Sequence, residues 1–323
     1  MAFAFVFAGQ GSQSVGMLAA LGATERSVRD TFAEASQVLG YDLWQLASAG
    51  PEEALNATER TQPAMLAAGV AVWRAWRARG GGLPALLSGH SLGEFTALVC
   101  AGAFEFPAAI ELVRFRGQAM QEAVPAGSGA MAAILGLEDD AVAAVCREAA
   151  QGAVVEAVNY NSPGQIVIAG DTAAVQRAIE GARTRGAKRA IALPVSVLAH
   201  SSLMRGAGER LGVKLQALTV RQPEIPYVSA VDARQHSEPA DIRALLVRQI
   251  SSPVRWTDTV RALARGDIAQ VIECGPGKVL TGLNRRIERR PDLAFLSLED
   301  PASIDAALGR LGGVAMKLGG THA

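Results

Sequence analysis

Residues 86–102, LLSGHSLGEFTALVCAG, hold a G-x-S-x-G pattern between a short apolar run and a helical pattern. An apolar run that ends in glycine is typical of a buried parallel strand. The pentapeptide Gly89-His90-Ser91-Leu92-Gly93 then predicts a sharp turn into a helix, the setting of a nucleophile elbow. The alternative, a chance pentapeptide in a glycine-rich chain, is disfavoured by that setting. We therefore expect Ser91 to be a nucleophile.

The chain on both sides of this turn alternates between strands and helices. Short apolar runs predict four strands of one sheet, at residues 3–7, 84–88, 270–274 and 293–298. Helical patterns lie between them, at residues 27–39, 63–78 and 107–123. Strands that alternate with helices are typical of a parallel sheet in an α/β core.

The middle of the chain has a different pattern. It predicts strands at residues 129–135, 154–159, 165–169 and 187–194, with helices at residues 138–150 and 172–185. The order β-α-β-β-α-β is that of a ferredoxin-like unit. We expect a catalytic core of residues 1–124 and 198–311, a small subdomain of residues 125–197, and a flexible, glycine-rich tail of residues 312–323.

Composition narrows the class of protein. Half of the 323 residues are apolar, so a folded core is expected, and 31 basic residues balance 31 acidic ones. This balance argues against bulk binding of nucleic acid or of an anionic membrane. The cysteines Cys100, Cys146 and Cys274 are far apart, which disfavours zinc and disulfide sites. Without a basic signal region or an apolar run of ~18 residues, we expect a cytoplasmic protein.

A serine nucleophile needs a base, and the chain has four histidines. His90 adjoins the serine on a tight turn, His236 lies in a polar loop and His322 lies in the tail. Elimination favours His200, although a purely structural histidine remains the alternative. No carboxylate between Ser91 and His200 stands at the end of a predicted core strand, so a simple hydrolase triad is not supported.

A second glycine motif, Gly9-Gln10-Gly11, follows the first strand. Glycine lets the backbone approach a substrate closely, so the N–H of Gln10 is expected to share an oxyanion hole with the N–H of Leu92. A degraded dinucleotide-binding motif is the alternative, but its third glycine is missing.

Several motifs, taken together and in order, resemble the malonyl-CoA:acyl carrier protein transacylases, the malonyltransferases of fatty acid synthesis. They are FAGQGSQSVGM at 7–17, TQPAMLA at 61–67, GHSLGEFTALVCAG at 89–102, RGQAMQ at 116–121, NSPGQIVIAG at 161–170, His200, and ECGPGKVLTGL at 273–283. The resemblance implies a hydrolase-like α/β core with a ferredoxin-like insert.

The resemblance also implies roles for matched residues. Ser91 would be the acylated nucleophile, His200 its base, and the N–H groups of Gln10 and Leu92 would hold the oxyanion. Arg116 would bind the free carboxylate of malonate. The backbone carbonyl of Gln249 would orient His200. No metal or cofactor is implied, because malonyl-CoA is a substrate.

Arg116 suits its implied role on chemical grounds, because a guanidinium can grip a carboxylate with two parallel hydrogen bonds. The alternative is an ordinary solvated charge on a helix. The chain departs from the family at Ala8, where proline is usual, and at Ala199, where a bulkier or hydroxylated residue is common. These two positions put fine acyl selectivity in question.

Two basic clusters, at residues 183–189 and 278–290, each carry a net charge of +4. The resemblance implies an acidic, phosphopantetheinylated carrier as partner, and a basic rim could attract it. The candidate carrier-binding residues are Lys188, Arg189, Lys278, Arg285 and Arg286. The alternative is two ordinary solvated helix faces.

The expected function is transfer of malonyl from malonyl-CoA to the phosphopantetheine thiol of acyl carrier protein through a malonyl-serine, supplying type II fatty acid synthesis. One alternative is a trans-acting acyltransferase for a polyketide or other carrier. Another is a serine esterase or thioesterase, which would hydrolyse simple esters. A third is an idle carrier-binding module, which the intact Ser91, His200 and Arg116 disfavour.

Overall fold

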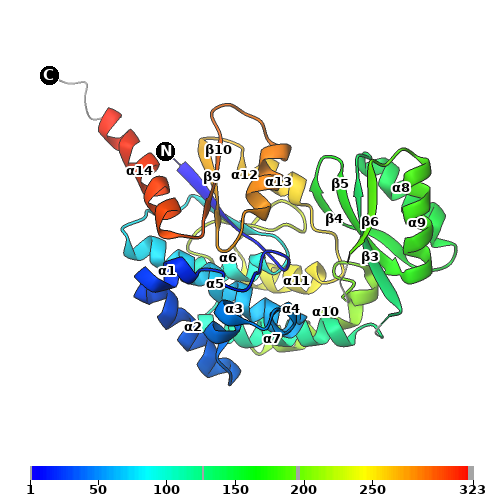
Figure 1. The fold of residues 1–323 in the computed structure, drawn as a ribbon, viewed down its shortest axis with the longest axis horizontal. Coiled ribbons are helices and arrows are strands. Elements are labelled where there is room, and N and C mark those ends of the chain that lie inside the picture. Colours follow the sequence, from blue (N-terminus) through cyan, green and yellow to red (C-terminus); the bar gives the residue numbers. More distant parts are fainter. Residues whose placement is uncertain (1, 126, 194–196, 319–323) are drawn as a thin grey trace.

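The computed structural model describes residues 2–125, 127–193 and 197–318 (Figure 1). Two sheets organise these residues, a larger one in the core and a smaller one beside it. The predicted α/β architecture with an inserted antiparallel unit is confirmed. Among the described residues, no helix is both long and apolar enough to cross a bilayer.

The core sheet has the strand order β10-β9-β1-β2-β7-β8. Its strands are β1 (Ala2–Phe7), β2 (Leu86–Gly89), β7 (Tyr227–Val228), β8 (Gln235–His236), β9 (Ile268–Cys274) and β10 (Ala294–Leu298). The first five in spatial order run parallel, and β8 pairs with β7 in the antiparallel sense. β1 lies near the centre, and its residues from Phe3 to Phe7 are buried because helices cover the sheet.

Twelve helices of the described residues belong to the core unit and pack around its sheet. They are α1 (Ala19–Thr24), α2 (Arg26–Leu39), α3 (Leu43–Ala49), α4 (Glu52–Asn56), α5 (Thr58–Ala78), α6 (Gly93–Cys100), α7 (Phe106–Glu122), α10 (Arg205–Gln216), α11 (Pro239–Gln249), α12 (Trp256–Leu263), α13 (Val279–Ile287) and α14 (Pro301–Leu318). A 3-10 turn, Ser202–Met204, precedes α10. Aromatic contacts lock α5 onto the sheet, with Trp76 5.9 Å from Phe3 and 5.5 Å from Phe5 between ring centroids.

The small sheet is antiparallel throughout, in the order β4-β5-β3-β6. It consists of β3 (Gly129–Leu135), β4 (Val155–Ser162), β5 (Gln165–Asp171) and β6 (Arg189–Leu193), with α8 (Asp139–Ala150) and α9 (Thr172–Thr184) on its far side (Figure 1). This is the predicted β-α-β-β-α-β order. It has a hydrophobic cluster of its own, which includes Ile134, Ile168 and Val175. The domain boundaries at 124/125 and 197/198 stay a prediction.

The two sheets are joined through β4. Tyr160 donates its N–H to the Val254 carbonyl at 2.9 Å, and Val254 donates its own to the Val158 carbonyl at 2.9 Å. Val254 follows α11, so the segment that carries Gln249 is tied to the small subdomain. The cleft between the two units is therefore held by backbone pairing.

The structure differs from the sequence prediction in several details. β7 and β8 were missed because two residues are too few to show an alternating pattern. The helix expected from residue 63 begins at Thr58 and contains Pro63; its buried face compensates for the lost hydrogen bond. α14 extends to Leu318 and so includes residues 312–318, which were assigned to the tail; the flexibility of that tail stays a prediction. β6 ends at Leu193; residue 194 and the tail residues 319–323 lie outside the described residues.

Candidate active site

Ser91 stands on a tight turn between β2 and α6, with φ of 53°. The two glycines of the motif make the turn possible. A Cβ on Gly89 would meet the backbone carbon of Gly93 at 1.9 Å, and one on Gly93 would meet the Phe7 carbonyl oxygen at 1.9 Å. No larger residue fits at either position. The turn holds Ser91 in a strained left-handed conformation directly after the end of β2.

His200 faces the serine across the cleft. Its Nε2 lies 2.8 Å from Ser91 Oγ, and its Nδ1 lies 2.8 Å from the carbonyl oxygen of Gln249. A carbonyl only accepts, so Nδ1 carries the hydrogen and Nε2 is free to accept the serine proton. The predicted pairing of serine, histidine and backbone carbonyl is thus present in the geometry.

The pKa of His200 is lowered to about 3, first by burial and then by the charge of Arg116. The imidazole is therefore neutral at physiological pH. A neutral imidazole with one acceptor nitrogen directed at a hydroxyl can act as a general base. Its backbone is fixed as well, because His200 N–H donates to the Ile250 carbonyl at 3.0 Å.

Arg116 projects from α7 into the same site, and its side chain is buried. It donates to Gln62 Oε1 at 2.8 Å, to Gln249 Oε1 at 3.0 Å and to Ser91 Oγ at 3.2 Å. Its Nε has no partner among the described residues. The alternative of a solvated helix charge is ruled out by this burial. The guanidinium can accept an anionic group next to the nucleophile.

Gln249 makes three contacts in this geometry. Its backbone carbonyl holds His200, as stated above, and its side-chain nitrogen donates to the Ser91 carbonyl at 3.0 Å. Its side-chain oxygen accepts from Arg116. One residue at the end of α11 therefore braces the base, the cation and the nucleophile turn together.

The loop after β1 lies against the nucleophile turn. A Cβ on Gly9 would meet the His90 carbonyl oxygen at 2.6 Å and the Leu92 nitrogen at 3.6 Å. Within the described residues, the N–H groups of Gln10 and Leu92 have no backbone acceptor. Two unpaired N–H groups beside Ser91 are what an oxyanion hole requires.

A cavity of 440 Å³ lies over Ser91, between the core and the small subdomain. Predicted residues that line it are Gln10, Ser91, Leu92, Arg116, Ala199 and His200. Its apolar wall includes Met120, Met131 and Val197, and its polar wall includes Asn159 and Asn161 from β4. Both units contribute side chains, so the subdomain forms part of the site.

Sequence reasoning missed three polar residues around this cavity, of which Gln62 and Glu94 are buried. Gln62 holds Arg116, Asn161 Oδ1 lies 2.9 Å from Nε2 of His90, and Glu94 lies behind the serine. Gln62 and Asn161 are inside motifs quoted for the resemblance. Glu94 had its own signal, a single charge in an otherwise apolar helical stretch.

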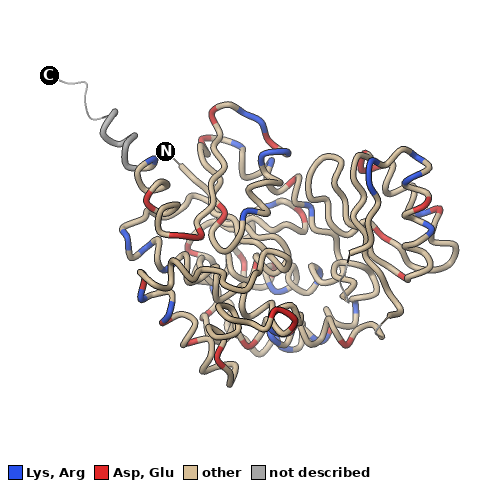
Figure 2. Tube along the Cα trace, viewed as in Figure 1, with Lys and Arg blue, Asp and Glu red and all other residues tan. Residues whose placement is uncertain are grey.

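The five candidate carrier-binding residues are exposed, and they come from both units. Arg286 of α13 donates to Gln165 of β5 at 2.9 Å. Leu135 of β3 lies opposite Gln165 on one side and opposite Arg189 of β6 on the other, so Arg286 and Arg189 are at the same end of the small sheet. Lys278 pairs with Glu299 at 2.8 Å. Figure 2 shows basic residues on α13 and on the small subdomain. The two predicted clusters therefore lie at adjoining edges of the two units.

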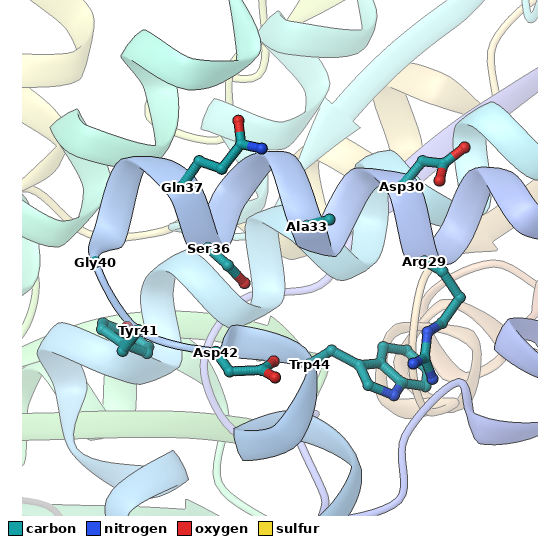
Figure 3. A pocket seen from close by; sticks show the side chains of 9 residues that line it. All are labelled: Arg29, Asp30, Ala33, Ser36, Gln37, Gly40, Tyr41, Asp42 and Trp44. Carbon is teal, nitrogen blue, oxygen red and sulfur yellow. The ribbon is translucent and has the colours of Figure 1, made fainter.

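A separate open groove of 680 Å³ lies between α2 and α3 (Figure 3). There the Arg29 guanidinium lies over the Trp44 ring, 4.5 Å from its centroid. The groove shares no lining residue with the cavity over Ser91. None of the predicted site residues lies in it.

Comparisons with known proteins show what the chain is similar to. The family model described as acyl transferase domain matches residues 4–290. A malonyl CoA-acyl carrier protein transacylase of Salmonella typhimurium is 53% identical over 306 residues, which cover 95% of this chain and 98% of that protein.

Solved structures are similar over the same length. An acyl carrier protein S-malonyltransferase from Vibrio cholerae superposes with a TM-score of 0.92 at 54% identity, covering 95% of this chain and 100% of that chain. A malonyl-transacylase solved in complex with a type II PKS acyl-carrier protein superposes with a TM-score of 0.94 at 51% identity, covering 96% and 100%.

Proposed function

This chain belongs to the malonyl CoA-acyl carrier protein transacylases of the acyl transferase family, and we propose that its malonyl transfer proceeds through a covalent intermediate on Ser91. The enzyme transfers malonyl from malonyl-CoA to acyl carrier protein for fatty acid synthesis. The observation that carries the proposal is the 2.8 Å contact between Ser91 Oγ and the neutral His200 Nε2.

In the first half-reaction His200 takes the Ser91 proton while Oγ attacks the thioester carbon of malonyl-CoA. A C–O bond forms, the C–S bond breaks, and the imidazolium returns its proton to the departing CoA sulfur. The Gln249 carbonyl, which accepts the Nδ1 hydrogen, stabilises the transient positive charge on the ring. This contact takes the place of a triad carboxylate.

The negative oxygen of the tetrahedral intermediate would be held by the N–H groups of Gln10 and Leu92. Each donor of this kind contributes on the order of a hundredfold or more in rate. Leu92 is also the N-cap residue of α6, whose N-terminus favours negative charge.

Arg116 would bind the carboxylate at the far end of the malonyl group. Its present acceptors are neutral oxygens, and it lies 3.2 Å from Ser91 Oγ, within reach of an acyl group on that oxygen. A buried guanidinium gains more from a carboxylate than from an amide oxygen. The site would therefore select malonyl over acetyl.

The second half-reaction reverses the first. The phosphopantetheine thiol of the carrier gives its proton to His200 and attacks the malonyl-serine, which releases Ser91. The basic edge formed by Lys188, Arg189 and the α13 arginines would attract the acidic carrier to the mouth of the cleft. The alternative carrier, from a polyketide system, is supported by the relative solved with a type II PKS carrier.

We propose that malonyl-CoA and the carrier are the only small-molecule and protein partners needed, because nucleophile, base and oxyanion donors all come from this chain. We also propose a cytoplasmic location, which the three buried free cysteines support.

A transfer assay with intact-mass readout tests the function. The enzyme is mixed with malonyl-CoA and a holo carrier of fatty acid synthesis, with the apo carrier and Ser91→Ala as controls. Malonylation of the holo carrier alone, lost in the variant, is the expected result. Release of free malonate without carrier malonylation would contradict transfer and indicate a thioesterase. A polyketide carrier run in parallel tests the alternative acceptor.

A further inference from the structure

Glu94 places a buried carboxyl group behind the nucleophile, and no step above uses it. It lies three residues after Ser91, in the first turn of α6, with 1% of its surface exposed. Its Oε2 accepts from the Tyr227 hydroxyl and from Ser229 Oγ at 3.0 Å, and its Oε1 accepts from the Ala230 N–H at 3.2 Å. Three donors favour the ionised carboxylate at this position.

Arg116 is a buried cation whose three acceptors are neutral, and an uncompensated buried charge is costly. Burial lowers its pKa to about 10, and the charge of Glu94 opposes that shift. Arg116 also lies over the ring of Phe95, 5.4 Å from its centroid, and Phe95 directly follows Glu94, so this buried carboxyl group is near the buried cation.

Gln249 connects the two charges. Its side-chain oxygen accepts from Arg116, its side-chain nitrogen donates to the Ser91 carbonyl, and its amide favours the ionised form of Glu94. A change of charge at Glu94 thus acts on the group that braces both the cation and the nucleophile turn.

We propose that Glu94 is the internal counter-charge of Arg116 and so sets how strongly the site prefers an acyl group with a carboxylate over a neutral one. This inference rests on the proposed role of Arg116. Glu94 is a positioning residue, because it acts through Arg116 and Gln249. A malonyl carboxylate and an ionised Glu94 share the same cation, so the charge of Glu94 weakens the grip on malonyl.

Other charges around Glu94 are few. Asp232, in the loop after β7, adds a like charge, and Tyr227 is its hydrogen-bond donor. β1 and β2 contain no ionisable side chain. The charged residues of α5 make contacts away from Glu94: Glu59 with Gln118, Arg60 with Tyr41, Arg74 with Glu34 and Arg77 with the Gly81 carbonyl. The charged residues of α7 other than Arg116 do so as well: Glu111 with Lys214, Arg114 with the Leu39 carbonyl and Glu122 with Arg210.

The preference is then expected to vary with pH. Burial raises the pKa of Glu94 to about 7, whereas the pKa of His200 is about 3 and that of Arg116 about 10. Near neutrality Glu94 alone of these three titrates. A bound malonyl carboxylate disfavours the ionised form of Glu94, so malonylation is favoured below that pKa and loses ground to acetylation as the pH rises through it.

Single-turnover acylation with malonyl-CoA and with acetyl-CoA, between about pH 6 and pH 8.5, tests the proposal. The ratio of the two rate constants cancels the steps that the substrates share. In the wild type the malonyl/acetyl ratio should fall with rising pH. In Glu94→Gln it should be independent of pH and, at the alkaline end, on the order of tenfold higher. An equal loss with both substrates at every pH would indicate a merely structural role and overturn the proposal.

Two further variants keep the test decisive if Glu94→Gln does not fold. Tyr227→Phe removes a donor from the ionised carboxylate, so the midpoint of the ratio should move to higher pH; an unmoved midpoint would contradict the proposal. Glu122→Gln, on the exposed end of α7, should keep the wild-type profile. Absence of any malonyl adduct in the wild type would overturn the proposed function, whereas normal malonylation with a pH-independent ratio would overturn only the role of Glu94.

Discussion

Replacing Arg116 by alanine is expected to change which acyl group the enzyme accepts. The side chain is 2% exposed and donates only to neutral oxygens, so it is positioned to bind a carboxylate that arrives with the substrate. Removing one partner of such a buried, hydrogen-bonded charge pair costs about 2–5 kcal/mol. At 1.4 kcal/mol per tenfold, kcat/KM for malonyl-CoA should fall by about 30-fold to about 4,000-fold.

Acetyl-CoA should gain relative to malonyl-CoA, because acetyl has no carboxylate to pair with Arg116 and so loses no such contact in the variant. The assay is CoA release in single turnover with each thioester, together with the mass of the acyl-enzyme. Arg114→Ala is the matched control: it lies on the same helix, and its one side-chain hydrogen bond within the described part of the chain is to the Leu39 carbonyl, at 3.5 Å. An unchanged malonyl/acetyl ratio in folded Arg116→Ala would refute the assignment.

Three other predictions follow from the same geometry. His200→Ala should slow acetyl-CoA acylation by about 10²–10⁴-fold, because the general base is lost. In the wild type the rate of acetyl-CoA acylation should stay level from about pH 8 to pH 5, because His200 is protonated only near its pKa of about 3. Stopped-flow measurement of CoA release checks this, and a fall in rate near pH 6.5 would show that the histidine is unperturbed. Gly93→Ala should lower Tm by several degrees or prevent folding, because the added Cβ would overlap the Phe7 carbonyl; an unchanged melting curve would contradict the turn geometry. Reversing charge with Lys188→Glu and Arg286→Glu should raise KM for the carrier several-fold, more at low salt, without slowing acylation by malonyl-CoA; an unaltered KM would exclude the basic edge as a docking surface.

The core of the fold was predictable because its signals are local. β1, with the sequence AFAFVF, is apolar along its length since the sheet is covered by helices, and β9 and β10 show similar runs. β7 was not predictable because its two residues are placed by pairing with β2, which no periodicity records. The small subdomain was predictable because each of its elements is long enough to show its own period.

Some residues of the site were predictable from the sequence and others were not. Ser91 is marked by a local motif, and His200 emerged by elimination among four histidines. Arg116 and Gln249 are 133 residues apart and meet only because the middle of α7 and the end of α11 border the same cleft, so the residues alone gave no reason to pair them. Glu94 escaped notice because its partners, on β7 and the loop that follows, belong to the part of the sheet that the sequence did not predict.

We infer that the malonyl group is carried on Ser91 and that its carboxylate is what the site selects. The most direct test is the intact mass of the enzyme after brief exposure to malonyl-CoA or acetyl-CoA, followed by peptide mapping, with Ser91→Ala alongside. We expect one malonyl adduct, mapped to Ser91, with much less acetyl adduct, and no adduct in the variant. An adduct that persists in Ser91→Ala, or transfer to the carrier with no acyl-enzyme at any time, would contradict it.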